Sequence, residues 1–322
     1  MTVATAVAHP NIALVKYWGK RDADLNLPAT GSLSMTLDVF PTRTTVALDP
    51  ALDGDAFTLD GRAATGIPLD RVTRFLDVVR ALAGVETRAR VTSAGTVPEA
   101  AGLASSAAGF AALAGAASAA YGLDLDERAL TRLARRGSGS ASRSVIPGFA
   151  VWHAGDTDEE SFAESVDAPA LAMVIAIVDA GEKPVSSRAA MRRTVLTSPF
   201  YPAWVTSTDE SLRSALAACR DGDVDRLGRI AETNALRMHA LIQSCDPPIR
   251  YLAPTSLAVL DRVEALRARG VGAYATADAG PNVVVVCRPA DAAEVRDALA
   301  DLAEIVVAHP GPGLRIEPGA VA

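Results

Sequence analysis

The side chains most able to do chemistry lie in four short stretches that are far apart in the chain. In the first stretch, residues 11–22, Lys16, Lys20 and Arg21 stand close to Trp18. Several cationic and hydrogen-bonding side chains within so short a span could hold a phosphorylated ligand. The alternative interpretation is a solvated charged turn, which is the commoner role of such a stretch.

The second stretch, residues 98–110, contains Gly102 followed by the serine pair Ser105 and Ser106. We expect a loop that follows a strand and turns here into a helix. The first N–H groups of a helix have no intrahelical partner, and the helix dipole favours an anion at that end. The pattern therefore suggests a phosphate cradle, with an alanine-rich core helix and a serine cap as the alternative. It is not a Walker A loop, because no Gly-Lys-Ser/Thr follows the glycine.

The third stretch, residues 137–144, combines four serines and two glycines with Arg143. Hydroxyl groups donate hydrogen bonds, and a guanidinium group matches the geometry of phosphate or carboxylate. A flexible Ser/Gly linker is the alternative interpretation. Because apolar segments flank the stretch at 129–133 and 145–152, we expect an ordered loop that contacts a ligand.

The fourth stretch, residues 271–287, predicts a strand, a turn and a second strand. Asp278 stands at the end of the first strand and is the only acid in this apolar segment. An aspartate before an Ala-Gly-Pro turn is most often a turn former. A carboxylate in such a place can also act as a base when burial and a basic neighbour tune it. The residues alone leave both interpretations open.

The elements that must position these side chains follow from the hydrophobic periodicity. Alternation predicts a strand at 87–91, and an almost uncharged run predicts a buried helix that ends near residue 121. Residues 68–83 carry apolar side chains on one helical face. A further helix is predicted at 123–136, with Gly137 as its C-terminal cap.

Several shorter segments have the pattern of β-structure. Residues 5–17 indicate a loop that turns into a strand. The strictly alternating segments 32–37 and 44–48 suggest a hairpin-like β region. Strands are also expected at 151–152 and 171–178.

The second half of the chain has mainly helical periodicity. A break in the pattern places a soft domain boundary near residue 183, and a basic helical segment opens at 185–193. Ser187 and Arg188 lie at the start of this segment, where they would suit an anion. Further helices are expected around residues 211–218, 227–241, 257–266 and 293–302.

The composition limits the class of protein. A chain of 322 residues, of which 49% are apolar, can form two moderate domains with a sizeable core. The net charge of −7 argues against general nucleic-acid binding, which needs a basic face. We expect a cytoplasmic protein with no membrane partner, because no apolar run reaches the roughly 20 residues of a membrane span and no signal-peptide pattern is present. Three cysteines without paired spacing fit a reducing compartment and give no zinc pattern.

Taken together, the four stretches resemble the mevalonate diphosphate decarboxylase family of the GHMP kinase superfamily. The motifs are Asn-Ile-Ala-Leu-Val-Lys-Tyr-Trp-Gly-Lys-Arg-Asp at 11–22, Ala-Ala-Gly-Leu-Ala-Ser-Ser-Ala-Ala-Gly-Phe at 100–110, Gly-Ser-Gly-Ser-Ala-Ser-Arg-Ser at 137–144 and Asp-Ala-Gly-Pro-Asn at 278–282. The resemblance implies an α+β fold with two domains and a site between them. Residues 1–183 would form a ribosomal-protein-S5-like α/β domain that binds ATP, and residues 184–322 a ferredoxin-like α+β domain.

The resemblance also implies a reaction. In this family ATP phosphorylates the tertiary alcohol of mevalonate 5-diphosphate. Phosphate then departs as the carboxylate leaves as carbon dioxide, which gives isopentenyl diphosphate. The implied co-substrate is ATP with Mg²⁺, and the implied assembly is a homodimer.

Individual roles are carried over by the same resemblance. Asp278 would orient or deprotonate the C3 hydroxyl, Arg143 would lie near the carboxylate, and Lys16 would balance charge beside the hydroxyl. The side chains implied to bind the substrate are Tyr17, Trp18, Lys20, Ser138, Ser140, Ser187 and Arg188. The residues implied to bind ATP are Ser93, Gly102, Leu103, Ala104, Ser105 and Ser106, of which Ser106 would also contact Mg²⁺.

The sequence departs from the family pattern at a few positions, and other functions stay open. Gly95 and Thr96 stand where many members carry two asparagines, and Ser142 stands where a cysteine is common. One alternative is a mevalonate 3-kinase that stops at the 3-phosphate, and another is a decarboxylase for a substrate with one phosphate. A non-catalytic binding protein is a third. The presence of Asp278 together with Arg143 argues against it.

Overall fold

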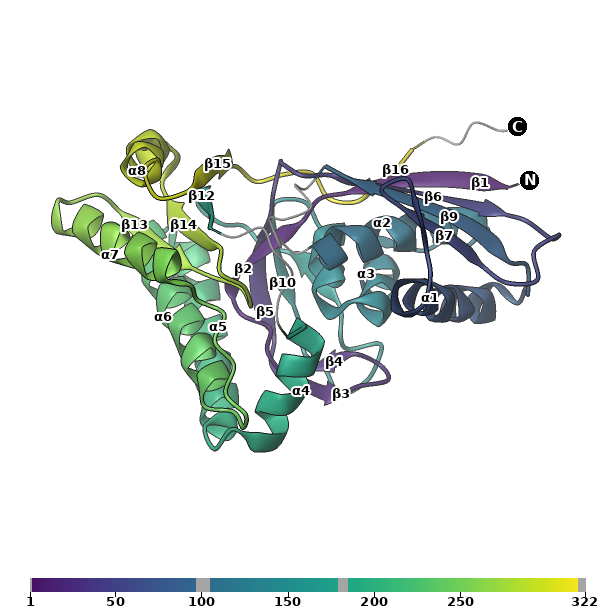
Figure 1. The fold of residues 1–322 in the computed structure, drawn as a ribbon, viewed down its shortest axis with the longest axis horizontal. Coiled ribbons are helices and arrows are strands. Elements are labelled where there is room, and N and C mark those ends of the chain that lie inside the picture. Colours follow the sequence, from purple (N-terminus) through teal and green to yellow (C-terminus); the bar gives the residue numbers. More distant parts are fainter. Residues whose placement is uncertain (1, 97–104, 179–184, 318–322) are drawn as a thin grey trace.

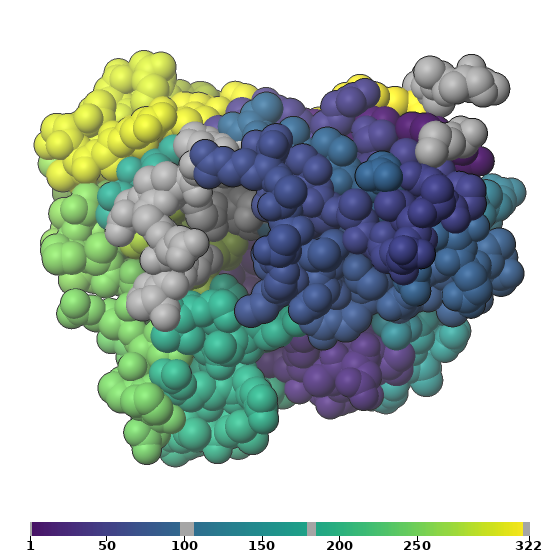
Figure 2. Space-filling model, turned by 45° about the vertical axis from the view of Figure 1, so that its right-hand side comes forward, coloured from purple at the N-terminus to yellow at the C-terminus, as the bar shows by residue number. Residues whose placement is uncertain are grey.

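The computed structural model describes residues 2–96, 105–178 and 185–317. Figure 1 shows two lobes, each with its own sheet and helices, and a smaller sheet between them. The space-filling view in Figure 2 shows the N-terminal half, in purple and blue, beside the C-terminal half, in green and yellow. Within the described residues, no helix is long and apolar enough to cross a membrane.

The first lobe is built on a six-stranded sheet with the strand order β16-β1-β6-β9-β7-β8. Every second side chain of β1 is buried, as expected for a sheet with one covered face. The expectation of a loop at the start of 5–17 is therefore wrong for residues 5–8, which belong to β1. The strands are β1 (Val3–Ala8), β6 (Thr42–Leu48), β7 (Ala56–Leu59), β8 (Arg62–Ala64), β9 (Ala89–Gly95) and β16 (Arg315–Glu317).

The helices of this lobe are α1 (Ile67–Ala83), α2 (Ser105–Ala120) and α3 (Glu127–Gly137). α1 and α2 pack on the sheet, and α3 packs on α2. The small side chains of α2 let it lie directly against β1 and β6 in the main core of the lobe (Figure 1). The predicted cap at Gly137 is wrong, because Gly137 is the last helical residue and Ser138 is the C-cap. A Cβ on Gly137 would lie 2.1 Å from the ring of Phe110, so close packing of α3 on α2 requires glycine there.

The predicted hairpin of 32–37 and 44–48 is also wrong. β5 pairs with β2 and β10, whereas β6 pairs with β1 and β9 in the other sheet. Both segments alternate, and alternation does not reveal which strand is the partner. The middle sheet has the order β11-β10-β5-β2 and a two-stranded ribbon, β3-β4, follows β2. Their bounds are β2 (Asn11–Val15), β3 (Lys20–Asp22), β4 (Leu27–Pro28), β5 (Ser32–Thr36), β10 (Phe149–Trp152) and β11 (Ala163–Ser165).

The serine-rich stretch after α3 is ordered, as expected. It forms a short 3₁₀ helix, η1 (Gly139–Val145), and most of its residues are buried. η1 packs against α2, α3 and the middle sheet. The stretch is thus part of the core, and the linker interpretation is wrong.

The second lobe has a four-stranded sheet with the order β13-β14-β12-β15. β12 precedes the boundary predicted near residue 183, yet it pairs with β14 and β15 from the end of the chain. Residue 183 itself lies outside the described residues, so the boundary stays a prediction. The strands are β12 (Ala172–Ile177), β13 (Ala273–Thr276), β14 (Val283–Cys287) and β15 (Glu304–Ala308).

The helices of the second lobe cover both faces of that sheet. α7 and α8 share one core with it, and α5 and α6 share another core with it and with the middle sheet. α6 packs against β2 as well as β13, so it joins the lobes. The bounds are α4 (Ser187–Thr197), α5 (Tyr201–Asp221), α6 (Val224–Gln243), α7 (Pro254–Ala268), η2 (Pro289–Asp291) and α8 (Ala292–Leu299).

Candidate active site

A cavity of about 410 Å³ lies where β2, α2, η1, α4 and the β13–β14 turn meet. Lys16, Ser106, Arg143 and Asp278, one from each predicted stretch, all line it. The four stretches therefore converge as the sequence predicts. The other predicted residues on its wall are Tyr17, Trp18, Lys20, Ser138, Ser140, Ser187 and Arg188.

Lys16 and Asp278 form an ion pair at the deep end of the cavity. Nζ of Lys16 donates a hydrogen bond of 2.7 Å to Oδ1 of Asp278 and one of 2.9 Å to the carbonyl oxygen of Ala13. The lysine side chain is 1% exposed and the aspartate side chain is 42% exposed. Burial lowers the pKa of Lys16, and the carboxylate opposes that shift. The buried cation thus holds an acid whose side chain is partly exposed on the cavity wall.

Helix α6 supports this pair from behind, through two residues that sequence reasoning missed. Oδ1 of Asn234 accepts the backbone N–H of Lys16 at 2.8 Å, and Asn234 is fully buried. His239 is also buried, and its Nε2 has no hydrogen-bond partner in the described part of the chain. Burial, followed by the charge of Lys16, lowers the pKa of His239 to about 4, so the ring is neutral at pH 7.

Hydrogen bonds to neighbouring polar side chains fix Arg143 in the cavity wall. Its Nε and Nη1 donate to the hydroxyls of Ser34 and Ser32 at 2.9 and 2.6 Å. Its Nη2 donates to Oδ1 of Asn11 at 3.1 Å, and the side chain is 3% exposed. Burial lowers the pKa of Arg143 to about 10, which leaves the group charged at neutral pH. The guanidinium is therefore a fixed cation suited to a carboxylate.

Tyr17 and Trp18 differ in how they meet the cavity. The ring of Tyr17 packs edge-on against Trp152, with ring centroids 4.8 Å apart. A Cβ on Gly139 would lie 2.9 Å from both rings, so η1 can approach them only with glycine at that position. Oη of Tyr17 is buried without a hydrogen-bond partner among the described residues, and burial raises its pKa. Tyr17 is thus an unused donor. Trp18 is 2% exposed and packs into an apolar cluster, and its Nε1 is also buried without a hydrogen-bond partner among the described residues.

The opposite end of the cavity is strongly cationic. Lys20 and Arg188 line it together with Arg71 from α1, a residue that sequence reasoning missed. Burial, and then the charges of Arg188 and Arg71, lowers the pKa of Lys20 to about 8. Nζ of Lys20 donates to Oδ1 of Asn26, which also went unpredicted. Three cations in one place form a site for a polyanion.

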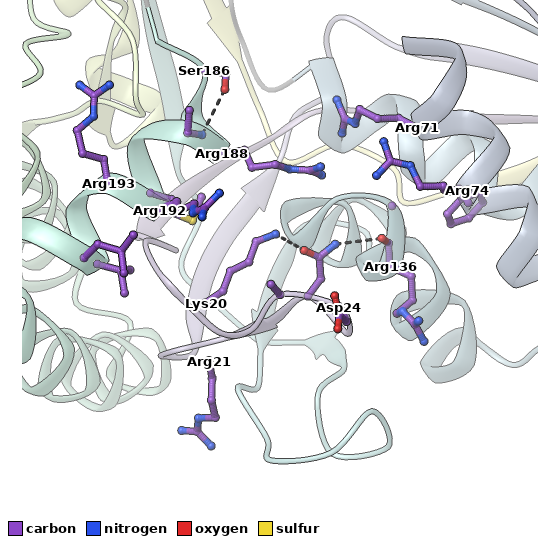
Figure 3. A pocket seen from close by; sticks show the side chains of 18 of the residues that line it. Lys20, Arg21, Asp24, Arg71, Arg74, Arg136, Ser186, Arg188, Arg192 and Arg193 are labelled. Atoms are coloured by element: carbon purple, nitrogen blue, oxygen red, sulfur yellow. Dashed lines mark hydrogen bonds between the residues drawn. The ribbon is translucent and has the colours of Figure 1, made fainter. Parts of the chain in front are cut away.

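This cationic end opens into a larger groove of about 1170 Å³. Figure 3 shows arginines entering it from α1 on one side and from α4 on the other, with Lys20 between them. Ser186 is the N-cap of α4, and its hydroxyl accepts the N–H of Ala189 at 3.3 Å. Ser187 begins the helix beside it, so the N-terminus of α4 faces the same groove.

Three serine side chains lie together on the cavity wall at the start of α2 and η1. Oγ of Ser138 lies 3.4 Å from Oγ of Ser106 and 3.4 Å from Oγ of Ser140. Ser106 belongs to the first turn of α2, which Ser105 begins. These hydroxyls are free to rotate toward a ligand, since each is both a donor and an acceptor.

One described residue of the predicted nucleotide site, Ser93, does not line the cavity. Gly102, Leu103 and Ala104 lie outside the described residues. Ser93 is buried on β9, where its hydroxyl lies 2.9 Å from that of Thr44, and it lines neither the cavity nor the groove. The nucleotide role of Ser93 stays a prediction.

The donor set in the cavity suits a magnesium ion held mainly by ligand phosphates. Within the described residues, no group of three or more His, Cys, Asp or Glu side chains could bind a metal by itself. Mg²⁺ typically uses one or two protein oxygens together with substrate phosphates and water. Ser106 and Asp278 offer such oxygens on the cavity wall.

The fold and this cavity define the class of the protein: a two-domain α+β protein of the GHMP kinase fold, with a polar site between its domains. Residues 8–163 match the family model for the diphosphomevalonate decarboxylase-like N-terminal domain, and residues 173–309 match that for the mevalonate 5-diphosphate decarboxylase C-terminal domain. The chain belongs to the diphosphomevalonate decarboxylase family.

Individual relatives agree with this assignment. Diphosphomevalonate decarboxylase of Ganoderma lucidum is 37% identical over 88% of this chain and 77% of its own length. The solved mevalonate diphosphate decarboxylase from Enterococcus faecalis is 42% identical with a TM-score of 0.93, and the match covers 99% of both chains. A structure of MDDEF in complex with MVAPP, AMPPCP and magnesium is 44% identical with a TM-score of 0.95, also over 99% of both chains.

Proposed function

We propose that this chain catalyses the ATP-dependent decarboxylation of mevalonate 5-diphosphate to isopentenyl diphosphate. One observation carries the proposal: the Lys16–Asp278 pair, the fixed guanidinium of Arg143 and the cationic end of the cavity lie on the walls of a single cavity. Such an arrangement suits a molecule with an alcohol, a carboxylate and a diphosphate. The solved relative in complex with MVAPP and AMPPCP supports the same substrates.

The charges of the cavity give the substrate one orientation. Its diphosphate lies against Lys20, Arg71 and Arg188, where three cations match its negative charge. Tyr17, Ser138, Ser140 and Ser187 add hydrogen-bond donors along the wall, and Trp18 closes it with a buried ring. The carboxylate lies near Arg143, whose guanidinium group is already fixed by hydrogen bonds to Ser32 and Ser34. Positioning of this kind supplies much of the catalysis of phosphoryl transfer.

Asp278 faces the C3 hydroxyl and orients it toward the γ-phosphate of ATP. The carboxylate accepts the hydroxyl proton as the oxygen bonds to the γ-phosphorus, and the bond from that phosphorus to the bridging oxygen of ADP breaks, so that ADP leaves. Lys16 stays charged beside it and stabilises the ionised acid, which keeps Asp278 ready to accept. Phosphate then leaves C3 with the electron pair of the C–O bond. The bond to the carboxylate breaks, carbon dioxide departs, and the electron pair of that bond forms the double bond to C3. A site closed to water protects the electron-poor C3 during that step.

The nucleotide lies on the side of α2. The N-terminus of this helix, with Ser105 and Ser106, receives the phosphates of ATP, and Ser106 would provide an oxygen for Mg²⁺. When bound, Mg²⁺ neutralises charge on the phosphates. We also assign Ser93, Gly102, Leu103 and Ala104 to the nucleotide side, on the resemblance of the motif.

The domain division and the assembly are further parts of the proposal. We assign residues 1–183 to the ATP-binding domain and 184–322 to the C-terminal domain, although β12 pairs with the strands of the second. We also propose a cytoplasmic homodimer. Sedimentation equilibrium of the purified chain tests the dimer, and the mass of a single chain over the full concentration range contradicts it.

The experiment that tests the function is the stoichiometry of ADP and carbon dioxide. With mevalonate 5-diphosphate, ATP and Mg²⁺, we expect the two products in equal amounts. ADP without carbon dioxide identifies a 3-kinase, and turnover only with the monophosphate identifies the other decarboxylase. Either result overturns the proposal, and so does nucleotide binding without any turnover.

A further inference from the structure

Two pairs of arginines face one another across the large groove beyond the cavity (Figure 3). On α1, Arg71 and Arg74 are three residues apart, and on α4, Arg188 and Arg192 are four residues apart. Residues at these spacings share one face of a helix. α1 therefore presents two cations, one behind the other, to the groove, and α4 presents a matching pair. Arg193 of α4 also lines the groove, but its Nη1 donates a hydrogen bond of 3.2 Å to the carbonyl oxygen of Pro247.

The two pairs differ in depth. Arg71 and Arg188 line both the cavity and the groove, whereas Arg74 and Arg192 line only the groove. The inner pair, with Lys20, is the end to which the proposed function assigns the diphosphate of the substrate. The outer pair lies beyond that position, in the direction of the open groove of about 1170 Å³.

The positive charge of these two arginine pairs is not balanced by a carboxylate of the described residues, whereas Arg21 and Arg136 on the same wall pair with Asp156 and Asp158. Within the described residues, none of the four arginines forms an ion pair with a carboxylate, and Asp24 is the only acid on the groove wall. Nε of Arg71 is buried without a hydrogen-bond partner in that part of the chain. Burial, and then the charges of Arg188 and Arg74, lowers the pKa of Arg71 to about 10. Four positively charged side chains thus lie near one another without a carboxylate partner among the described residues. This arrangement suits the binding of an anion from solution.

We propose that Arg74 and Arg192 form a second anion subsite in series with the diphosphate position, so that the groove binds linear inorganic polyphosphates of three or more phosphate groups. Two phosphates lie against Lys20, Arg71 and Arg188, and the third lies between Arg74 and Arg192. The assignment of the inner pair to the substrate diphosphate rests on the proposed function. A bound polyphosphate therefore excludes mevalonate 5-diphosphate.

Calorimetric titration with inorganic pyrophosphate and with tripolyphosphate tests the subsite, in the absence of any turnover. The wild-type chain should bind tripolyphosphate about tenfold more tightly than pyrophosphate, because one more phosphate meets two guanidinium groups. In the double variant Arg74→Gln/Arg192→Gln this preference should fall to about twofold or less, while the affinity for pyrophosphate changes by less than about threefold. Both arginines are exposed, so the variant should fold normally.

A matched control removes the same charge elsewhere. Arg220 on α5 and Arg296 on α8 line neither the cavity nor the groove, and the variant Arg220→Gln/Arg296→Gln should keep the tenfold preference. A wild-type chain without the preference overturns the proposal. So does an equal loss of the preference in both double variants, which would reflect net charge alone.

A competition experiment distinguishes binding of tripolyphosphate in the groove from its binding in the nucleotide site. Tripolyphosphate in the groove should be displaced by mevalonate 5-diphosphate and should stay bound when ADP saturates the nucleotide site. Displacement by ADP means that the triphosphate occupies the α2 end, and it overturns the proposal. If the preference depends on the two arginines but no decarboxylation occurs, the subsite is supported and the proposed function is refuted. Failure of the subsite proposal can therefore be distinguished from failure of the proposed function.

Discussion

Nζ of Lys16 lies 2.7 Å from Oδ1 of Asp278, although 262 residues separate them in the chain. The pair is asymmetric, because the lysine is buried and the aspartate side chain is 42% exposed. A buried ammonium without a partner would be costly, and the acid offsets that cost. The acid side chain is partly exposed on the cavity wall, where a substrate hydroxyl can reach it.

Removing the charge of Asp278 should stop the reaction. For Asp278→Asn we expect kcat to fall on the order of 10³-fold, because no base remains for the C3 hydroxyl. The affinity for ADP should change by less than about twofold, since the nucleotide lies on the side of α2. Initial rates of ADP and carbon dioxide release, with calorimetry for ADP, provide the measurement. The surface variant Asp221→Asn serves as the control, and near-normal turnover in Asp278→Asn would remove this residue from the mechanism.

Arg143 should not tolerate replacement by lysine. Its guanidinium is fixed by Ser32, Ser34 and Asn11 in a geometry that a single ammonium cannot reproduce. For Arg143→Lys we expect kcat/KM for mevalonate 5-diphosphate to fall by about 10²-fold. Arg132→Lys, at a partly exposed ion pair with Asp158, is the matched control and should stay near the wild type. Equal kinetics of the two variants would show that Arg143 does not contact the substrate.

Substrate binding should weaken at alkaline pH because of Lys20. Burial and two neighbouring arginines lower its pKa to about 8, so the free site loses a cation as the pH rises through that value. The KM for mevalonate 5-diphosphate should therefore rise between pH 7 and pH 9. In Lys20→Arg the guanidinium stays charged, and the rise should be at least halved. A KM profile of the variant that follows the wild type over this range would assign the titration to another group.

His239 should make the protein less stable in mild acid. Burial and Lys16 lower its pKa to about 4, whereas the unfolded ring has a value near 6.5. As the pH falls below 6.5 the unfolded state takes up a proton that the folded state excludes, so the free energy of unfolding decreases. Between pH 7.5 and pH 5 this group alone should remove about 2 kcal/mol.

Urea unfolding of His239→Gln measures that contribution. The variant should lose about 2 kcal/mol less than the wild type over the same pH interval, whatever its stability at pH 7.5. His153→Gln, at an exposed ring, should follow the wild type. Parallel losses in His239→Gln and the wild type would contradict a buried neutral imidazole.

The local elements could be predicted because their causes are local. The apolar face of 68–83 and the uncharged run that ends near residue 121 predict α1 and α2, and the structure confirms both. The alternating segments 32–37 and 44–48 are strands as expected. Their predicted pairing fails, because alternation records which face is buried and not which strand lies alongside.

The residues of the candidate site also fall into two groups: those that the sequence indicated and those that it did not. The resemblance of the four motifs to a known family pointed to Lys16, Arg143 and Asp278 as candidates. The residues alone indicated a ligand contact for the stretch of Arg143 and left Asp278 open as a turn former or a base. Asn234 and His239 gave no such signal, because each is one polar residue on an amphipathic helix and acquires its role only when α6 packs against β2. Contacts of this kind depend on which surfaces meet after folding.

The sequence by itself determined the chemical groups that the site contains and the helices and strands that carry them, since both follow from neighbours along the chain. Only the tertiary structure decided that a lysine after β2 of the middle sheet meets an aspartate of the second lobe, and that two arginines on α1 face two on α4. The physical reason is that burial of apolar faces sets how elements pack, and packing alone brings distant charges close enough to act together.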